Sequence, residues 1–177
     1  MRWGPTELRT RLAAAMSIYA EAMGYPPETA EQRTGYTAAH TTLDGFQAVA
    51  ALGERDALVG FGYGYLIAPG QWWHDQVNMA MPPGRAHRWL PDSFELCELH
   101  VRPAHQGRGI GRSLLLTLAE GVPQSRMLLS TPEGDTRAWR LYRSLGFVDL
   151  VRHYRFPGDN RPFAVLGAPL PFGPAGA

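Results

Sequence analysis

The stretch His105-Gln106-Gly107-Arg108-Gly109-Ile110-Gly111-Arg112 decides the fold, because three alternating glycines stand between a strand-like run and an amphipathic helix. The apolar run 94–102 predicts the strand, and the helical spacing of apolar residues after the glycines predicts a helix over 110–120. Glycines let a backbone approach an anion closely, and the first N–H groups of the following helix face that anion. The arginines at 108 and 112 add positive charge beside these donors. We therefore expect a phosphate-binding loop at this junction.

Two common nucleotide-binding patterns do not fit this loop. The dinucleotide pattern G-x-G-x-x-G, started at Gly107, requires a glycine where Arg112 stands, and no acidic residue marks a ribose-binding strand further on. The P-loop pattern requires a lysine after the glycines, whereas all 17 basic residues of this chain are arginine. Both hydride transfer and nucleotide hydrolysis are therefore disfavoured.

The spacing matches Q-x-x-G-x-G instead, formed by Gln106, Gly109 and Gly111. With these residues the chain resembles the GNAT superfamily of acyl-CoA-dependent N-acetyltransferases, in which this loop binds the pyrophosphate and pantetheine of acetyl-CoA. The resemblance implies acetyl-CoA as the co-substrate and no metal. The positions that it implies for contact with acetyl-CoA are Leu99, His100, Val101, Gln106, Gly107, Arg108, Gly109, Ile110, Gly111, Arg112 and Asp135.

A second motif of the same family follows in the correct order. It consists of Asp135, Ala138, Leu141-Tyr142, Leu145 and Gly146-Phe147. The family usually shows Asn, then Ala, then a Leu-Tyr pair and Leu-Gly-Phe, so the aspartate is a departure that puts any CoA contact through an amide N–H in doubt. Read without the resemblance, the apolar members share one face of a helix and three arginines share the other. We expect Asp135 to be the N-cap of this helix and Gly146 to end it.

The order of expected elements resembles the GNAT fold, an α/β (α+β) fold with a mixed, mostly antiparallel central sheet flanked by helices. Besides the two motif helices and the strand before the loop, we expect helices over 6–23 and 28–40 and strands over 46–52, 57–67, 126–130, 147–156 and 163–166. The family commonly opens with a strand, and only residues 1–5 precede the first helix, so the strand is absent or the chain starts upstream. Residues 1–177 predict a single domain, with 168–177 as a loosely held tail.

The composition of the chain limits which kinds of partner and which cellular compartment we expect. The net charge of +1, without a basic run, gives no electrostatic footprint for nucleic acid, and no apolar run approaches the roughly 18 residues of a membrane span. Cys97 is the only cysteine, which excludes an intramolecular disulfide, and we expect it to be a small buried hydrophobic residue. The six histidines lack a metal-ligand spacing. We expect a cytoplasmic protein without nucleic-acid or membrane partners.

Amine acetylation requires a base, an oxyanion donor and an acid. The resemblance assigns the role of the acid to Tyr142, because a tyrosine hydroxyl is ordinarily protonated at neutral pH. It assigns the role of the oxyanion donor to a backbone N–H within 99–101. For the base, Glu95 and Glu98 lie on opposite faces of one strand, and a carboxylate shielded from water has a raised pKa suited to this task. His100 is an alternative base. Each glutamate is equally well interpreted as a partner of an arginine or of solvent, and the family often deprotonates its amine through ordered water.

The acceptor site is expected in the long insertion over 69–93, as a lid, a binding loop or an interface that would make the protein a homodimer. Its spacing predicts a short helix halted by two prolines at 82 and 83. Trp72 and Trp73 offer aromatic walls for a cationic amine, and Tyr63 and Tyr65 are candidates for the same pocket. The alternative is that these aromatic residues pack in the core or against a second subunit.

The leading hypothesis is acetyl transfer from acetyl-CoA to a primary amine of a small molecule, by direct attack in a ternary complex. The alternatives are acetylation of a protein N-terminus or lysine, and an acyl-CoA-binding sensor without catalysis.

Overall fold

The structure is a computed structural model that describes residues 1–173 and divides into two compact units. The first unit joins residues 1–65 to residues 96–122, and the second joins residues 66–95 to the residues from 123 onward. The boundaries fall inside two long strands, β3 (Leu58–Leu66) and β4 (Ser93–Val101). Each unit is therefore built around its own part of the sheet.

The first unit holds strands in the order β1-β2-β3-β4. β1 (Arg2–Trp3) pairs antiparallel with β2 (Gln47–Leu52), and β2 pairs antiparallel with β3. The turn between β2 and β3 is a short 3-10 helix, η1 (Glu54–Asp56). The hairpin predicted from the two apolar runs is therefore confirmed.

A short opening strand is present, so the first of the two alternatives left by the sequence, that this strand is absent, is wrong. β1 is only two residues long, yet Trp3 pairs with Ala48, and the amino group of Met1 donates a hydrogen bond to the carbonyl oxygen of Ala50 over 2.9 Å. Periodicity does not reveal so short a strand, because two residues complete only one period of the alternation. Its pairing with a segment almost fifty residues away defines it.

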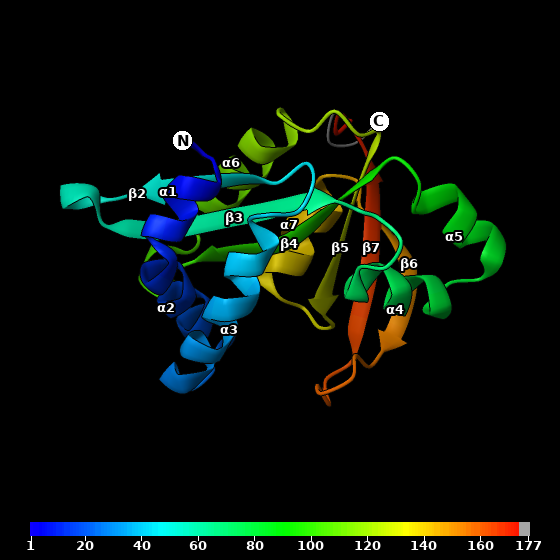
Figure 1. Cartoon of the computed structure of the whole chain (residues 1–177), viewed down its shortest axis with the longest axis horizontal. Coiled ribbons are helices and arrows are strands. Elements are labelled where there is room, and N and C mark those ends of the chain that lie inside the picture. The colour runs from blue at the N-terminus through cyan, green and yellow to red at the C-terminus, as the bar shows by residue number, and fades with distance from the viewer. Residues whose placement is uncertain (174–177) are drawn as a thin grey trace. The chain divides into compact units, whose positions relative to one another are not determined.

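Helices cover both faces of the first unit's sheet. They are α1 (Pro5–Thr10), α2 (Leu12–Met23), α3 (Pro27–His40) and α6 (Ile110–Ala119). α2 and α3 lie side by side (Figure 1), and Met16 of α2 packs in one core cluster with Phe61 and Tyr63 of β3. A side chain at Gly60 would touch Leu114 of α6, so α6 covers the face opposite Phe61, because neighbouring residues of a strand point to opposite faces.

The helix predicted over 6–23 is interrupted. Arg11 departs from helical geometry, with φ −110° and ψ 20°, and separates α1 from α2. Its guanidinium donates a hydrogen bond to the carbonyl oxygen of Asp56 over 2.7 Å. The end of α2 is as predicted, because Gly24 takes the left-handed conformation at φ 68° that terminates helices.

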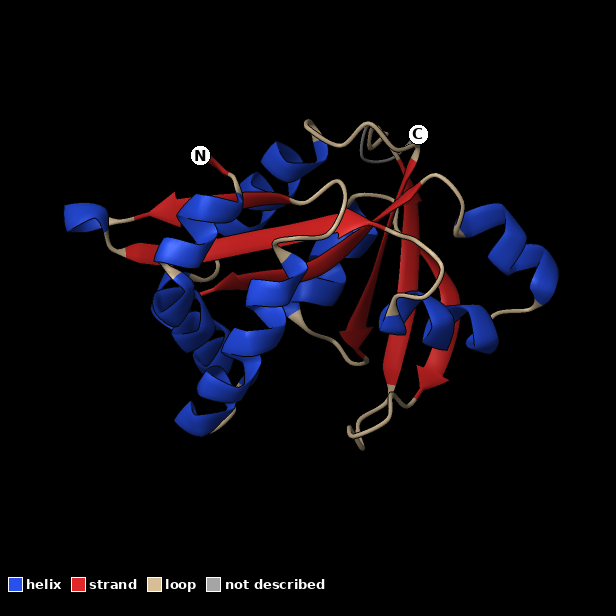
Figure 2. Ribbon diagram, viewed as in Figure 1, coloured by secondary structure: helices blue, strands red, loops and turns tan. Residues whose placement is uncertain are grey.

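The second unit holds strands in the order β4-β5-β7-β6. The first residues of β4 pair parallel with β5 (Arg126–Pro132), and β7 (Phe163–Pro169) pairs antiparallel with both β5 and β6 (Val148–Tyr154). β7 therefore lies between β5 and β6, its two predecessors in the chain (Figure 2). Across the described residues the sheet is mixed and mostly antiparallel, and it is flanked by helices, as the GNAT resemblance implies.

The insertion over 69–93 forms two helices where the pattern predicts one. α4 (Trp72–Ala80) ends just before the prolines as predicted, but α5 (Pro83–Trp89) begins at the second of them. Proline is well suited to the first helical position because its fixed φ is helical and no N–H is lost there. The indole of Trp89 fills the space beside Gly167 of β7, where a side chain would meet it at 2.8 Å.

The C-terminal segment is more ordered than expected over the residues that the structure describes. Ala168 and Pro169 belong to β7, and the ring of Phe172 lies 5.4 Å from that of Phe147. Of the tail predicted over 168–177, residues 174–177 lie outside the described residues. Within residues 1–173, none of the helices combines the length and apolar character needed to cross a bilayer.

Candidate active site

The glycine-rich loop has the backbone geometry of an anion cradle. After β4 the chain makes a short 3-10 helix, η2 (Pro103–His105), and then passes through Gly107 at φ 77° and Gly109 at φ 79°. These left-handed values favour glycine, and a Cβ added at either residue would meet nothing within 4 Å. Gly109 is the N-cap of α6, so the first N–H groups of that helix emerge at the loop. This arrangement suits the pyrophosphate of a coenzyme.

Packing holds the loop in place from both ends. The side-chain amide nitrogen of Gln106, Nε2, donates a hydrogen bond to the carbonyl oxygen of Val101 over 2.9 Å, which ties the loop to the end of β4. On the other side, α6 buries Leu114, Leu115 and Leu118. Arg108 and Arg112 are exposed, and they place positive charge beside the loop.

A carboxylate in β4 joins two basic side chains from different elements. Glu98 receives hydrogen bonds on Oε1 from Arg33 of α3, through Nη2 at 2.6 Å and Nε at 3.1 Å. Its other oxygen, Oε2, lies 2.6 Å from Nε2 of His100. The ring of Tyr19 completes the group, with the Arg33 guanidinium 5.5 Å from its centroid and the His100 ring edge-on at 5.2 Å. We call these residues, Arg33, Glu98, His100 and Tyr19, the Glu98 cluster.

The electrostatics of the Glu98 cluster differ from the expectation for a carboxylate base. Burial by itself would raise the pKa of Glu98, but the hydrogen bond and charge of His100, together with Arg33, hold this pKa below its ordinary value. Burial by itself would lower the pKa of Arg33, and the nearby carboxylate raises it above the ordinary value instead. Glu98 is thus held in the ionised form by its neighbours, so shielding from water does not make it a stronger base.

A second set of polar groups lies next to the Glu98 cluster. The hydroxyl of Tyr63 donates to Oγ1 of Thr37 over 3.3 Å and lies 3.1 Å from Nδ1 of His40 and 3.6 Å from Sγ of Cys97. Burial raises the pKa of Tyr63, and burial followed by the charge of Arg33 lowers the pKa of His40. Tyr63 is fully buried in the core of the first unit, which agrees with the alternative of a core residue. The second expected tyrosine, Tyr65, is also buried, with its hydroxyl 3.7 Å from Cys97 Sγ.

The strict alternation assumed for β4 fails at Cys97. The sequence pattern places Cys97 and Leu99 on one face, opposite Glu98. In the structure Cys97 contacts Tyr63, whereas Leu99 lies on the other side of the sheet, where it would meet a side chain at Gly62. Cys97 and Glu98 therefore both face the polar groups, and Cys97 is half-buried and also packs against the hydrophobic core cluster of the first unit.

The second unit positions Tyr142. It lies on α7 (Arg137–Ser144), is buried, and packs against Phe147 with ring centroids 5.5 Å apart. The predicted N-cap of this helix is wrong by one residue. Thr136 is the N-cap, and its side chain accepts a hydrogen bond from the backbone N–H of Trp139, whereas Asp135 pairs with Arg140 at the surface.

The two tryptophans of the insertion have different environments. Trp73 is buried in the core of the second unit, and its indole N–H donates to Ser130 Oγ over 3.1 Å. Trp72 is 57% exposed and packs against Phe156 at 5.7 Å. Glu95 is buried at the start of β4, in the same unit. The structure thus brings the candidates on β3 and on β4 from Cys97 to His100 together in the first unit, and places Glu95, both tryptophans and Tyr142 in the second.

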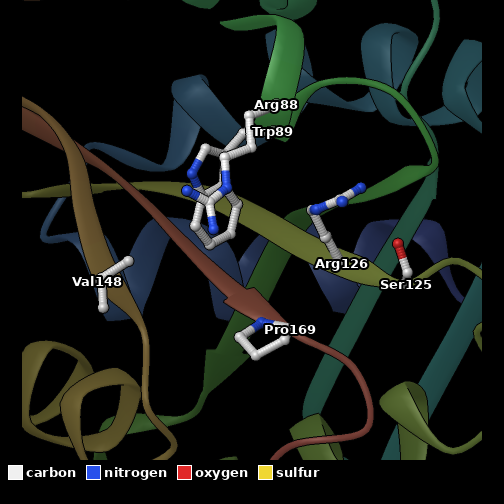
Figure 3. Close-up of a pocket in the computed structure, with 6 residues that line it drawn as sticks. All are labelled: Arg88, Trp89, Ser125, Arg126, Val148 and Pro169. Atoms are coloured by element: carbon white, nitrogen blue, oxygen red, sulfur yellow. The ribbon is translucent and has the colours of Figure 1, made fainter. Parts of the chain in front are cut away.

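One open pocket of the second unit was not suggested by the sequence. It has a volume of about 420 Å³ and is lined by Arg88, Trp89, Ser125, Arg126, Val148 and Pro169 (Figure 3). Its walls are largely apolar, and Arg126 donates a hydrogen bond to the backbone oxygen of Pro91. None of the candidate catalytic or coenzyme-binding residues lines it. Within residues 1–173, no three histidine, cysteine or carboxylate side chains gather as a metal site.

Two members of the Glu98 cluster were not predicted from the sequence. Arg33 and Tyr19 lie on helices far from β4 in the chain, and no motif joins them to it. The only hint in the sequence was an arginine within the helix predicted over 28–40, and an arginine alone does not show that it pairs with a carboxylate. Only folding shows that Arg33 is paired with a buried carboxylate.

Comparisons with known proteins agree with the fold and the loop geometry. Residues 12–147 match a family model described as the Acetyltransferase (GNAT) family. A GCN5-like protein acetyltransferase of Mycobacterium tuberculosis is 40% identical, over 94% of this chain and 95% of the relative. The N-alpha-acetyltransferase RimI of the same organism is 40% identical over a shorter region, 43% of this chain and 50% of the relative.

Solved structures show the same fold at lower identity. The ribosomal-protein-S18-alanine N-acetyltransferase of Escherichia coli has a TM-score of 0.65 and 17% identity, covering 95% of this chain and 93% of that one. The acetyltransferase yncA of Salmonella typhimurium, solved with its cofactor acetyl-CoA, has a TM-score of 0.65 and 19% identity, covering 96% of this chain and 94% of that one.

Proposed function

Because this chain belongs to the GNAT family of acetyltransferases, we propose that it transfers the acetyl group of acetyl-CoA to a primary amine on a protein, by direct attack in a ternary complex. The acyltransferase class and the acetyl-CoA donor follow from the family. The protein acceptor is supported by one observation. The relative that is 40% identical over nearly the full length of both chains is named a protein acetyltransferase.

The donor is held by the glycine-rich loop. The left-handed glycines and the N-terminal N–H groups of α6 suit the pyrophosphate, and Arg108 and Arg112 add charge beside them. A backbone N–H within 99–101 serves as the oxyanion donor. A contact of Asp135 with the coenzyme has less support, because its carboxylate pairs with Arg140 at the surface.

Tyr142 serves as the acid that protonates the departing thiolate of CoA. It stands at the tyrosine of the family's Leu-Tyr pair, and its buried position on α7 keeps its side chain in one orientation. Replacing it with phenylalanine preserves the packing against Phe147 and removes only the hydroxyl. We expect the Tyr142→Phe variant to lose about 100-fold in kcat while its affinity for acetyl-CoA stays unchanged.

The base is Glu95, Glu98 or His100, all on β4. Glu95 is buried near the start of this strand, in the second unit. Glu98 is held in the ionised form by Arg33 and His100, which disfavours proton uptake at its own oxygens. His100 is the remaining proton acceptor next to that carboxylate.

A small-molecule amine is the second candidate acceptor. Trp72 is an exposed aromatic side chain, and Asp75, one turn further on α4, presents an exposed carboxylate. An indole face and a carboxylate are the groups that recognise an organic cation. Charge reversal at Asp75 lowers the affinity for a cationic small molecule and leaves a neutral peptide substrate unaffected.

We also propose that the two units work as one catalytic domain in the cytoplasm, since the matched region 12–147 runs through both. A homodimer built through the insertion is part of the same proposal and is tested by light scattering. A single thermal unfolding transition, coincident by circular dichroism and by tryptophan fluorescence, is expected for one domain, and two separate transitions would contradict it.

The deciding experiment compares acceptors with one enzyme preparation. Acetyl-CoA is mixed with lysine-containing peptides, peptides with a free N-terminus, or a panel of small amines, and thiol release is followed. Because the chain has no lysine, every acetyl-lysine found by mass spectrometry belongs to the acceptor. Peptide turnover that is lost in Tyr142→Phe supports the proposal. Turnover of small amines alone favours the second candidate, and tight acetyl-CoA binding without any turnover favours a sensor.

A further inference from the structure

In the Glu98 cluster, the carboxylate of Glu98 holds the imidazole of His100 in place. Its carboxylate uses its two oxygens for two different partners, Oε1 for Arg33 and Oε2 for His100. The side chain of Glu98 is only 6% exposed, whereas that of His100 is 12% and that of Arg33 is 35% exposed. The buried anion is thus in the centre, and the two basic groups lie nearer to solvent.

The contact with Glu98 also selects a tautomer of His100. An ionised carboxylate is only an acceptor, so Nε2 of His100 must carry the hydrogen that it shares with Oε2. In the neutral ring Nδ1 then holds a lone pair. Within residues 1–173 Nδ1 makes no hydrogen bond, and the rings of Tyr19 and Phe61 fix the imidazole from two sides, at 5.2 and 5.7 Å.

We propose that His100 is the base that accepts the proton of the acceptor amine, that Glu98 orients it, and that Arg33 is the positioning residue that anchors Glu98. This inference rests on the proposed amine acetylation. The ammonium of the acceptor gives one proton to Nδ1 of His100, and its nitrogen then forms the C–N bond with the acetyl carbonyl carbon. The C–S bond breaks, and the thiolate takes a proton from the general acid. The nitrogen loses its second proton through solvent water as the amide forms, and a proton from solvent restores the general acid. His100 returns its proton to solvent.

Several titratable groups lie at or beside this imidazole. Glu98 of β4 and Tyr19 of α2 contact the ring, and Arg33 of α3 contacts both of these residues. Cys97 of β4, Tyr63 of β3 and His40 of α3 form the neighbouring set of polar groups. The two nearest opposite charges, Glu98 and Arg33, act on the protonated ring in opposite directions. Removing the carboxylate withdraws stabilisation from the imidazolium, and removing the guanidinium withdraws repulsion. The two variants therefore predict opposite changes in the pH dependence.

The first test measures kcat/KM against pH for Glu98→Gln and Arg33→Met, with the full chain and the best acceptor of the panel. The acidic limb of the profile is expected to move to lower pH in Glu98→Gln and to higher pH in Arg33→Met. In both variants kcat falls about 10- to 100-fold while KM for acetyl-CoA stays within about twofold, because orientation is lost and the donor loop is intact. His100→Asn is expected to lose about 100-fold or more in kcat.

Two further variants separate positioning from folding. Arg33→Lys keeps the charge but not the double contact with Glu98, so it should restore the position of the acidic limb and part of kcat. Arg2→Met is the matched control, since Arg2 makes an exposed ion pair with Glu120 in the same unit, and its kinetics should equal those of the unchanged enzyme. Should Arg33→Met fold poorly, Glu98→Gln decides through the shift of its acidic limb to lower pH.

A measurement without substrates tests the tautomer. Long-range ¹H–¹⁵N spectra of the unchanged enzyme are expected to show His100 as the Nε2–H form, and an Nδ1–H form would overturn the proposal. Turnover with acidic limbs that do not move in either variant would overturn it as well, while leaving the acetyltransferase proposal intact. An unchanged enzyme without turnover on any amine would instead overturn the proposed function.

Discussion

The glycine-rich loop and the Glu98 cluster lie in the same unit but are specified in different ways. The loop is built from backbone within one short stretch, where Gly107 and Gly109 take left-handed conformations and α6 begins. The Glu98 cluster is built from side chains that α2, α3 and β4 bring together. A backbone site can be recognised from local spacing, whereas a side-chain site depends on tertiary packing. The two should therefore respond differently to mutation.

The largest effect is expected at the loop. In Gly109→Val a β-branched side chain is forced into φ 79°, which strains the backbone and moves the first N–H groups of α6. We expect acetyl-CoA affinity to fall about 100-fold, with a smaller loss of stability. Isothermal titration calorimetry measures the affinity. Gly84→Val, at a helical glycine with open space around it, is the control, and equal losses in both would contradict the role of backbone geometry.

The Glu98 cluster should show the reverse pattern. Arg33→Met leaves the buried carboxylate with a single partner, so we expect a loss of about 2 kcal/mol in the free energy of unfolding. Acetyl-CoA affinity should remain within about twofold, because the loop does not depend on this pair. Urea unfolding and calorimetry on the same sample check both numbers. An Arg33→Met variant with unchanged stability and a reduced affinity for acetyl-CoA would contradict the proposed difference between the two regions.

The pH dependence of stability sharpens the comparison. The pKa of Glu98 in the folded state lies below its value in the unfolded chain, so its contribution is present above the unfolded pKa of about 4.3. That contribution is lost as the pH falls through this value toward the folded pKa. The free energies of unfolding of the unchanged protein and Glu98→Gln, measured with urea, should therefore differ at pH 7 and approach each other as the pH falls below about 4.3. A gap that widens on acidification would refute this assignment.

The smallest effects are expected at the start of α7, a local feature of the second unit. Thr136→Ala removes the side-chain cap on Trp139 N and should cost about 1 kcal/mol of stability. Asp135→Ala removes only an exposed ion pair with Arg140 and should cost less than about 0.5 kcal/mol. Thermal unfolding of both variants checks the order, and a larger loss in Asp135→Ala would restore Asp135 as the cap.

Much of the fold was predictable because its signals are local. The hairpin, the loop and both motif helices lie where the periodicity and glycines place them, and the GNAT family inferred from the two motifs is confirmed. The errors share a cause. β1 exists through its pairing with β2, Arg11 breaks a helix pattern that is continuous in the sequence, and Cys97 departs from the alternation of its strand. Each depends on contacts that a single stretch of sequence does not contain.

The sequence by itself identified the acetyltransferase family through two motifs, and the resemblance made the glycine-rich loop the candidate coenzyme site and Tyr142 the candidate acid. These motifs could be recognised because each lies within one segment, where spacing fixes which backbone groups and helix faces coincide. Only the tertiary structure decided which side chains share an environment. It paired Glu98 with Arg33 and His100, buried Tyr63, and assigned the two neighbouring tryptophans to different surroundings. The physical reason is that a buried carboxylate takes its pKa from whatever charges the fold places beside it, and these come from elements far apart in the chain.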